Sequence, residues 1–413
     1  MSKVDNKIIK KNTQWMFVSE FFNKGLMFLV TIMLTRYLGA KSYGQLSFSL
    51  SFAGLFIIIA DFGISTITTR NMAVDKSIFK KYLENIFVLK FLLALLTILV
   101  SMTVLSYMQK PNYFFNIVFI SILHLIISSY NEFISSVLRA FEKMKYISIS
   151  IFIRSISLFS LLSIFMFFEF GINYIVVAYL IAASFSFVYL IYFVRKKINK
   201  FSFDYDFNFN YLLLKKASPF ALSMAFSVIY LSIDSVLISY FLGDIELGYY
   251  SLGYGLTIVF YIIPSTLSNI YFPRLSIYFK SDKLKLKSLF NKLLMKLLLV
   301  ALPLVSLLYF IAPEFFLLFY GNEFSNSVPI FQFFLIALLF KFFAFPYGFL
   351  LLATNKENLR LLIQGISAFF NLSANLILIP RYGIFGAAIS TILSEFIILI
   401  LYFFFGKQQL KIN

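Results

Sequence analysis

The chain has 413 residues, of which 61% are hydrophobic, 20% aromatic and only 13% charged, and its formal net charge is +18. A soluble domain is about 45–50% apolar and about 25% charged, and its interior could not hide this much Phe and Leu, so most of the chain must lie in a lipid bilayer. The absence of cysteine excludes disulfides and Cys-based metal sites, and the single histidine, His124, excludes a site built from several histidines. We therefore expect no metal and no cofactor.

Long apolar stretches predict an all-α polytopic membrane protein with twelve transmembrane helices. Each stretch has about 20 or more residues, which is enough for a helix to cross about 30 Å of hydrocarbon. The runs are continuous rather than alternating, which favours helices over a β-barrel. Gly and Pro in "FEFGIN" and "IPRYGIFG" predict tight turns within two closely spaced pairs of helices. The predicted spans are residues 13–35, 44–67, 84–107, 113–138, 147–168, 171–194, 217–241, 247–272, 289–312, 328–353, 359–379 and 384–405.

The first apolar stretch is predicted to be a retained helix rather than a cleaved signal peptide. It is longer than a signal-peptide core, it contains Glu20 and Lys24, and no small-residue cleavage site follows it. The longest polar segment, residues 195–216, alternates aromatic and polar residues in "FSFDYDFNFNYLLLKK". This pattern predicts a linker along the inner membrane interface. The expected organisation is therefore an N-terminal six-helix bundle (1–194), a cytoplasmic linker (195–216) and a C-terminal six-helix bundle (217–413).

The distribution of basic residues predicts the orientation. With the N-terminus inside, only four of the 36 Lys and Arg residues lie in outer loops, namely Arg36, Lys41, Lys110 and Arg381. Four more lie within spans, and the rest lie in inner segments. This asymmetry predicts that both termini are cytoplasmic. The positive net charge then reflects topology, and we expect no nucleic-acid partner because no soluble domain exists to present a basic patch.

One phrase of the sequence occurs twice. "LTRYLGAKSYGQLSFSL" begins at Leu34, and "ISYFLGDIELGYYSLGY" begins 204 residues later, which aligns Gly39 with Gly243 and Gly44 with Gly248. The offset covers six predicted helices, so both halves enter the membrane in the same direction. We therefore predict two six-helix bundles related by a pseudo-twofold axis along the membrane normal. The alternative is that Leu-Gly turns recur by chance in a chain of low complexity.

Charged residues within the predicted spans are the candidates for function. Such residues are costly in a membrane and usually functional, and transporters bind substrates at the interface of their repeats. The basic residues predicted to line a central substrate cavity are Lys341, Arg154, Lys90 and Lys24. The acidic candidates for ion coupling are Glu395, Asp61, Glu20, Glu132 and Asp234.

Several of these residues have a structural interpretation as well. Glu20 and Lys24 are four residues apart on one predicted helix and can neutralise each other. Lys90 and Arg154 lie close enough to the inner helix ends for their side chains to reach the headgroups. A structural contact is also the alternative for Asp61, Glu132 and His124.

Lys341 is the strongest substrate-binding candidate because it lies near the centre of its predicted span. A lysine at that depth should face the cleft rather than lipid. The alternative is a structural salt bridge to Glu395, which is also central in its span. We expect Glu395 or Asp61 to carry a coupling proton.

Prolines interrupt three of the predicted helices. Pro264, Pro303 and Pro346 lie within apolar runs, where proline removes a backbone hydrogen bond and bends a helix. Such bends serve as bending points in a transporter, or only shape packing in a static bundle. No nucleotide-binding motif is present, which argues against direct ATP drive.

The repeated turn carries a family resemblance. "LTRYLGAKSYGQLSFSLSF", "ADFGISTITTRNMA", "DSVLISYFLGDIELGYYSLGY" and the late "IPRYGIFGAAISTILSE" resemble the Wzx-type polysaccharide-repeat (O-antigen or capsule) flippases of the multidrug/oligosaccharidyl-lipid/polysaccharide exporter superfamily. The resemblance covers essentially the whole chain. It implies alternating access and a polyprenyl-pyrophosphate-linked oligosaccharide moved from the inner to the outer leaflet of the bacterial plasma membrane.

The resemblance also implies the partners. These are the lipid-linked oligosaccharide, membrane lipids, H⁺ or Na⁺ as the coupling ion of an antiporter, and the polysaccharide polymerase and chain-length machinery of O-antigen and lipopolysaccharide biosynthesis. Basic side chains in a wet cavity would offset the cost of bringing a pyrophosphate into the membrane. Other functions considered are export of drugs or small molecules, and transport of lipid II or teichoic-acid-type lipids. A polymerase or glycosyltransferase is disfavoured by the short outer loops and the lack of paired carboxylates, so we expect no enzyme activity.

Overall fold

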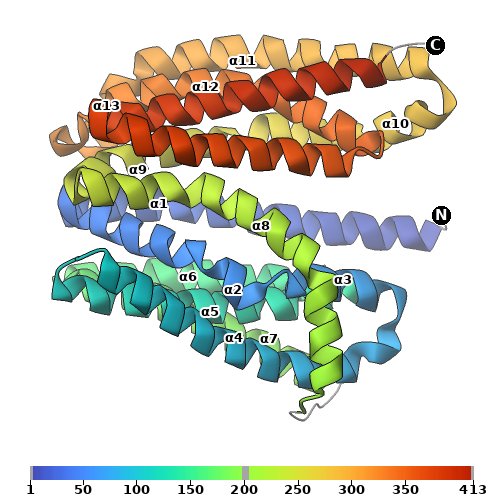
Figure 1. Ribbon diagram of the computed structural model, residues 1–413, viewed down its shortest axis with the longest axis horizontal. Helices are drawn as coiled ribbons and strands as arrows, with labels where there is room; N and C mark the ends of the chain where they lie inside the picture. The colour runs from blue at the N-terminus through green and yellow to red at the C-terminus, as the bar shows by residue number, and fades with distance from the viewer. Residues whose placement is uncertain (1–2, 198–203, 411–413) are drawn as a thin grey trace. The chain divides into compact units, whose positions relative to one another are not determined.

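The computed structural model describes residues 3–197 and 204–410, and for residues 3–10 and 197 only the backbone is described. Every element in this part of the chain is a helix (Figure 1). Ten helical stretches within these residues are long and apolar enough to cross a membrane. The expectation of an all-helical membrane protein is therefore confirmed.

The chain divides into two compact units, Met1–Leu38 with Ser49–Val228, and Gly39–Phe48 with Ile229–Asn413. The predicted boundaries at residues 194 and 217 both fall within the first unit, and they stay a prediction. The first unit contains most of α1 (Lys3–Leu55), α2 (Ile57–Asp61), α3 (Ile64–Val74), the 3₁₀ turn η1 (Lys76–Ile78), α4 (Phe79–Tyr107), α5 (Asn112–Ala140), α6 (Met144–Phe167), α7 (Ile172–Lys197) and the first part of α8 (Phe207–Phe241). The second unit contains the rest of α8, α9 (Asp244–Phe260), α10 (Ile262–Ser281), α11 (Lys283–Tyr320), the 3₁₀ turn η2 (Asn322–Phe324), α12 (Ser327–Ala353) and α13 (Glu357–Gln409).

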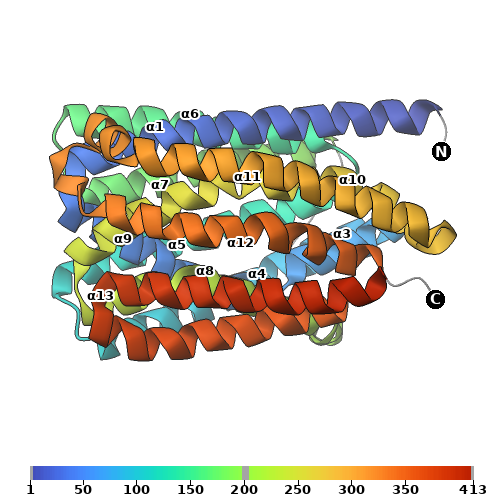
Figure 2. The same ribbon diagram turned by 90° about the horizontal axis from the view of Figure 1, so that it is seen from above.

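Two glycines interrupt the longest helices at predicted turns. Gly39 in α1 has φ 66° and Gly383 in α13 has φ 60°, values in the left-handed region that favours glycine. At Gly383 the chain reverses, and the two parts of α13 then run side by side (Figures 1 and 2). If α1 and α13 each count as two spans, the ten stretches become twelve, but the twelve-helix arrangement in two bundles stays a prediction, as does the cytoplasmic location of both termini.

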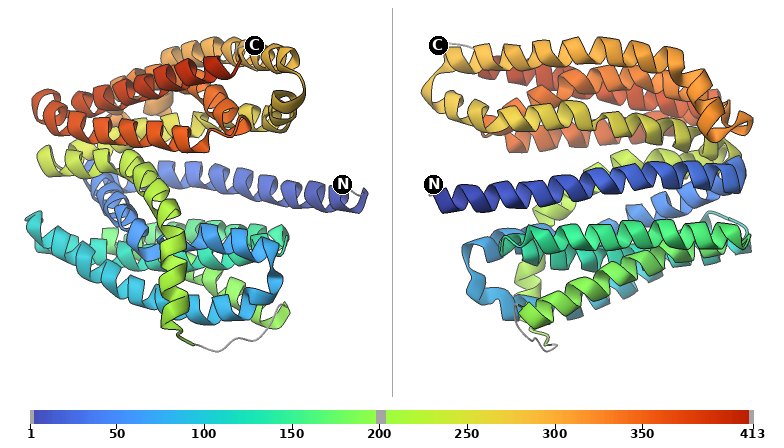
Figure 3. Two further views of the ribbon diagram at one scale, coloured as in Figure 1. Left: turned by 45° about the vertical axis from the view of Figure 1, so that its right-hand side comes forward. Right: turned by 180° about the vertical axis from the view of Figure 1, so that it is seen from behind.

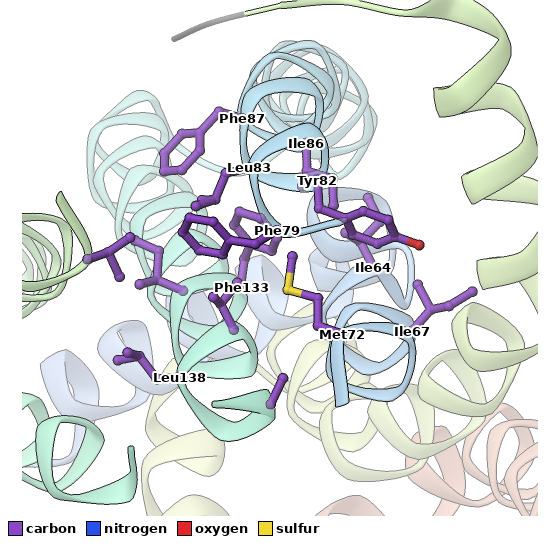
Figure 4. Close-up of a cluster of buried hydrophobic side chains, with 14 of the residues drawn as sticks. Ile64, Ile67, Met72, Phe79, Tyr82, Leu83, Ile86, Phe87, Phe133 and Leu138 are labelled. Carbon is purple, nitrogen blue, oxygen red and sulfur yellow. The ribbon is translucent and has the colours of Figure 1, made fainter. Parts of the chain in front are cut away.

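A hydrophobic core cluster of the first unit contains buried side chains from α3, α4, α5, α6, α7 and α8, and Figure 4 labels residues of α3, α4 and α5. On α4, Phe79, Leu83 and Ile86 recur at helical spacing, and Phe79 lies near Phe133 of α5 and Met72 of α3. Lipid tails are as apolar as these side chains, so close packing rather than the hydrophobic effect stabilises such contacts inside a bilayer.

The predicted second span, residues 44–67, is not one continuous helix. It is interrupted at Phe56 and again at Phe62 and Gly63, where φ is 47° and 72°. A Cβ atom on Gly63 would lie 2.8 Å from the backbone nitrogen of Ala221 and 2.9 Å from the carbonyl oxygen of Ala217. The helix therefore breaks where α8 of the same unit approaches too closely for a side chain.

The seventh predicted helix begins earlier than expected. Residues 207–216, assigned to the cytoplasmic linker from the sequence, form the start of α8, which runs across the other helices of the first unit (Figure 3). The Asp206 carboxylate accepts a hydrogen bond from the Phe209 amide at 2.9 Å and pairs with Lys81 at 3.0 Å. The Phe209 amide and the Lys81 ammonium both lower the pKa of Asp206. This helix cap explains the early start; residues 198–203 of the expected linker lie outside the described residues.

The prolines have different surroundings. Pro264 lies in the first turn of α10, just after the break at Tyr261, while Pro303 and Pro346 lie inside α11 and α12. Four prolines that were not singled out from the sequence also lie inside helices, and these are Pro219, Pro273, Pro313 and Pro380. Pro313 cannot donate to the Tyr309 carbonyl, and the Gln332 amide donates to that oxygen instead, at 3.0 Å.

The repeated turns meet within the second unit. A Cβ atom on Gly44 would lie 1.7 Å from the carbonyl oxygen of Asp244, and one on Gly248 would lie 2.1 Å from the carbonyl oxygen of Ala40. Asp244 and Gly248 are the residues 204 positions after Ala40 and Gly44. Gly44 of the first copy therefore approaches Asp244 of the second copy, and the equivalent glycine of the second copy, Gly248, approaches the equivalent residue of the first copy, Ala40. This reciprocity is the property of a local two-fold relation. It supports the interpretation of the repeated phrase as a duplication.

Candidate functional site

Lys341 forms an ion pair in the interior of the second unit. It lies near the middle of α12, which packs against α9, α10, α11 and α13 (Figure 2). Its Nζ atom is 2.6 Å from Oε1 of Glu395 on α13. The Lys341 side chain is 15% exposed and that of Glu395 is 1% exposed. The hydroxyl group of Tyr230 on α8 also donates a hydrogen bond to Glu395 Oε1.

Three aromatic rings surround the Lys341 ammonium group. Its Nζ atom lies 5.6 Å from the ring centroid of Tyr230, 5.5 Å from that of Tyr261 and 5.7 Å from that of Phe345. Each ring face attracts a cation within about 6 Å. The rings and Glu395 together stabilise a charged lysine at a depth where an unaccompanied ammonium would be costly.

A cavity opens beside this ion pair within the second unit. Its volume is about 60 Å³. The polar side chains that line it are Lys341 from α12, Arg360 and Gln364 from the first part of α13, and Tyr402 from the last part of α13. Two of its polar side chains are thus basic, and none is acidic.

Asp234 is the centre of a second buried polar cluster in the same unit. Its carboxylate accepts hydrogen bonds from Asn375 at 2.5 Å, Tyr250 at 2.7 Å and Thr391 at 2.8 Å. The Asn375 amide also donates to Asn371, at 3.1 Å. Among the described residues no basic side chain forms an ion pair with Asp234. The cluster is therefore a carboxylate surrounded by neutral oxygen and amide groups, which is chemistry suited to a proton or a small cation.

Lys90 and Asp61 form a buried ion pair in the first unit. The Lys90 ammonium donates to Asp61 at 2.8 Å, to the Ser129 hydroxyl at 2.6 Å and to the Ala60 carbonyl at 3.1 Å. Asp61 accepts a further hydrogen bond from the Ser65 hydroxyl at 2.5 Å. All three ammonium protons are used inside the unit, so Lys90 has no free donor for a substrate and does not extend toward lipid headgroups. This is the structural ion pair considered for Asp61.

The remaining candidates of the first unit have separate environments. Glu132 forms an ion pair with Arg139 at 2.7 Å, in which both side chains are partly exposed. Glu20 and Lys24 are both exposed. Arg154 on α6 is partly buried and lies in the electrostatic field of Glu20 and Glu132. The Nδ1 atom of His124 lies 3.1 Å from the carbonyl oxygen of Tyr179, as expected for a satisfied residue of a bundle.

The neutral members of these sites were not predicted from the sequence, because only charged residues within the spans were taken as candidates. Arg360 lies at the start of the eleventh predicted span. It was therefore assigned to the basic residues of the inner segments, which predict the orientation, and not to the candidates for substrate binding. Asn371 and Asn375, four residues apart in the same span, are a polar pair on one helix face that could have been recognised. The polar residues found only from the structure are Arg360, Gln364, Asn371, Asn375, Thr391, Tyr230, Tyr250, Tyr261 and Tyr402.

Comparison with known proteins decides the family. The model of a family described as "Polysaccharide biosynthesis protein" matches residues 9–279. The chain belongs to this family. It is 22% identical over 404 residues to the capsular polysaccharide biosynthesis protein CapF of Staphylococcus aureus, covering 96% of this chain and 99% of that protein. It is 24% identical over 401 residues to a putative O-antigen transporter of Shigella dysenteriae, covering 95% of this chain and 98% of the other.

Solved structures of transporters share the fold. The lipid II flippase MurJ in an inward closed conformation matches with a TM-score of 0.80 and 15% identity, over 94% of this chain and 87% of that chain. An inward-facing multidrug resistance MATE family transporter of the MOP superfamily matches with a TM-score of 0.75 and 14% identity, over 92% of this chain and 93% of the other. The resemblance inferred from the repeated turns is confirmed, and the protein is a multi-pass protein of the inner membrane.

Proposed function

We propose that this protein is a flippase and not an enzyme. It moves a polyprenyl-pyrophosphate-linked oligosaccharide from the inner to the outer leaflet of the bacterial plasma membrane by alternating access. Membership of the polysaccharide biosynthesis family and the names of its relatives support this class of substrate. The fold shared with MurJ and a MATE transporter supports a transport mechanism.

The observation that carries the proposal is the environment of Lys341. Within the described residues, Lys341 has one ion-pair partner, Glu395, and its side chain borders a cavity. Lys90, by contrast, uses all three of its protons within the first unit. The Lys341 ammonium group therefore has hydrogen-bond donors left for an anionic group. The pyrophosphate is the most highly charged group that links the lipid to the saccharide.

Asp234 is the proposed site of the coupling ion. Of the acidic candidates, Asp61, Glu132 and Glu395 each have a basic partner, and Glu20 is exposed. Asp234 is buried, and only neutral groups surround it in the described part of the chain. A proton or Na⁺ bound there would neutralise a charge that is costly to leave in a medium of low dielectric constant. The earlier expectation that Glu395 or Asp61 carries a coupling proton stays a prediction.

The experiment compares Lys341→Ala, Lys341→Arg and Lys341→Ala combined with Glu395→Ala, with glycan export and membrane abundance measured for each variant. An electrostatic role predicts that Lys341→Arg keeps much of the export, and that Lys341→Ala loses most of it at normal abundance. A purely structural salt bridge predicts low abundance of Lys341→Ala and recovery in the double variant. Full export by Lys341→Ala at normal abundance would refute the substrate role.

A further inference from the structure

We infer that the cavity lined by Lys341 and Arg360 is a phosphate-binding site. It extends from the first turn of α13, which carries Arg360, to the middle of α12, which carries Lys341. The inference rests on the proposed function and deepens it. It assigns the pyrophosphate of the substrate to Arg360, Gln364 and Tyr402 in addition to Lys341. Inorganic pyrophosphate is its simplest ligand.

Helical spacing brings the lining residues together. Lys341, Phe345 and Gly348 lie on one face of α12, at intervals of four and three residues. Arg360 and Gln364 are four residues apart in the first part of α13. Ile398 and Tyr402 are likewise four residues apart in its last part. Three helical faces therefore line the cavity.

Unpartnered polar atoms mark the cavity as a place for a ligand. The Tyr402 hydroxyl, on a side chain that is only 4% exposed, lies close to Arg360 and Gln364 but makes no hydrogen bond of ordinary geometry. The Arg360 Nε atom is buried and also lacks a partner. Leaving a buried donor without a partner is unfavourable, so an acceptor in the cavity would recover free energy.

The chemistry of the lining selects an anion of the phosphate type. The lysine, the arginine, the tyrosine hydroxyl and the glutamine amide all present donors. A guanidinium group has a planar fork that fits two phosphate oxygens, and an ammonium adds a point charge. Gly348 helps to form the cavity wall, because a Cβ atom there would lie 3.0 Å from the Tyr402 ring.

Position along the helices gives an order of contact. Arg360 lies within the first turn of α13, which begins at Glu357, whereas Lys341 lies near the middle of α12. The predicted orientation puts the start of α13 at the inner face. A pyrophosphate entering from that side would meet Arg360 before it reaches Lys341.

Glu395 competes with the anion for Lys341. Its Oε1 atom is paired with the Lys341 ammonium, and its buried Oε2 atom has no hydrogen-bond partner. Replacing this carboxylate by the neutral amide of Glu395→Gln removes a repulsive charge and releases the lysine. We therefore expect Glu395→Gln to bind the anion more tightly than the unmodified protein does, which a merely structural salt bridge would not predict.

The test is titration of the purified full-length protein with inorganic pyrophosphate, followed by calorimetry. Arg360→Gln should weaken binding roughly tenfold or more, and Tyr402→Phe severalfold, because each removes a donor to a charged group. Arg360→Lys should restore part of the affinity. Arg381→Gln, which removes a predicted outer-loop charge, is the matched control and should bind normally. Thermal unfolding of each variant shows that it is folded.

Three results would overturn the inference. They are no pyrophosphate binding by the unmodified protein, unchanged affinity in Arg360→Gln, or binding of glucuronate in preference to pyrophosphate. The last result would assign the site to an acidic sugar. Failure here is separable from failure of the proposed function, because Lys341→Ala could still abolish export while Arg360→Gln both binds pyrophosphate and exports glycan normally.

Discussion

Lys90→Met tests whether the buried ion pair of the first unit is structural. The substitution keeps the length of the side chain and removes its charge. The Asp61 carboxylate, which is only 5% exposed, then keeps Ser65 as a hydrogen-bond donor but loses its ammonium partner. Breaking a buried ion pair by removing one partner costs about 3–5 kcal/mol. Folded proteins have only about 5–15 kcal/mol of stability, so the loss should be plainly measurable.

The assay is thermal unfolding of the purified protein together with its abundance in membranes. Lys90→Met should unfold at a markedly lower temperature and accumulate poorly. Lys90→Met combined with Asp61→Asn should recover most of the stability, because no uncompensated charge remains. Lys24→Met, at an exposed position, is the matched control and should change stability little.

The opposite pattern would refute this reasoning. If Lys90→Met were as stable and abundant as the unmodified protein but failed to export glycan, the ammonium would serve the substrate, as the sequence alone suggested. Export that falls only in proportion to abundance supports a structural role.

Two further predictions concern the second unit. Gly44→Ala should lower stability by about 1–3 kcal/mol, because its Cβ atom would lie 1.7 Å from the Asp244 carbonyl oxygen. Thermal unfolding measures this, and Gly25→Ala, which meets nothing within 4 Å, is the control that should show no such loss. Asp234→Asn should abolish the response of glycan export to an imposed Na⁺ or H⁺ gradient while the protein remains abundant, and an unchanged response would count against Asp234 as the coupling site.

The features predicted correctly depend on short stretches of sequence. A run of apolar residues indicates a span whatever surrounds it, and a glycine after a long apolar run indicates a turn, as at Gly39 and Gly383. The contact between Lys341 and Glu395 was one of two stated alternatives, because a charge near the centre of a span is expected to find a partner of opposite charge.

The features missed depend on segments far apart in the chain. The helix breaks at Gly63 because Ala217, more than 150 residues later in the chain, approaches it closely. The sequence around Phe62 contains no local pattern that predicts this break. The same holds for the surroundings of Asp234, whose partner Thr391 comes from another helix. Neutral side chains that come together only in the folded protein are not found when candidates are chosen by their charge.

The repeated phrase is reflected in the backbone of this protein more closely than in its chemistry. The paired glycines of the two turns make reciprocal contacts, and the break at Phe56 recurs one residue out of register at Tyr261. A repeated scaffold therefore reproduces turns and helix breaks, which local backbone sterics determine.

The charges do not follow the repeat. At the same offset of 204 residues, Asp234 corresponds to Val30 and Asp61 corresponds to Ser265. In the first unit, the Lys90 ammonium is saturated by three hydrogen bonds. In the second unit, a lysine borders a cavity and a carboxylate lacks a basic partner among the described residues. An ion pair whose hydrogen-bond donors are all used can only stabilise the fold. A charged group with free hydrogen-bonding capacity can bind and release a ligand. The binding chemistry of transport is therefore expected to reside mainly in the second unit, and substitutions there should separate export from stability where those at Lys90 cannot.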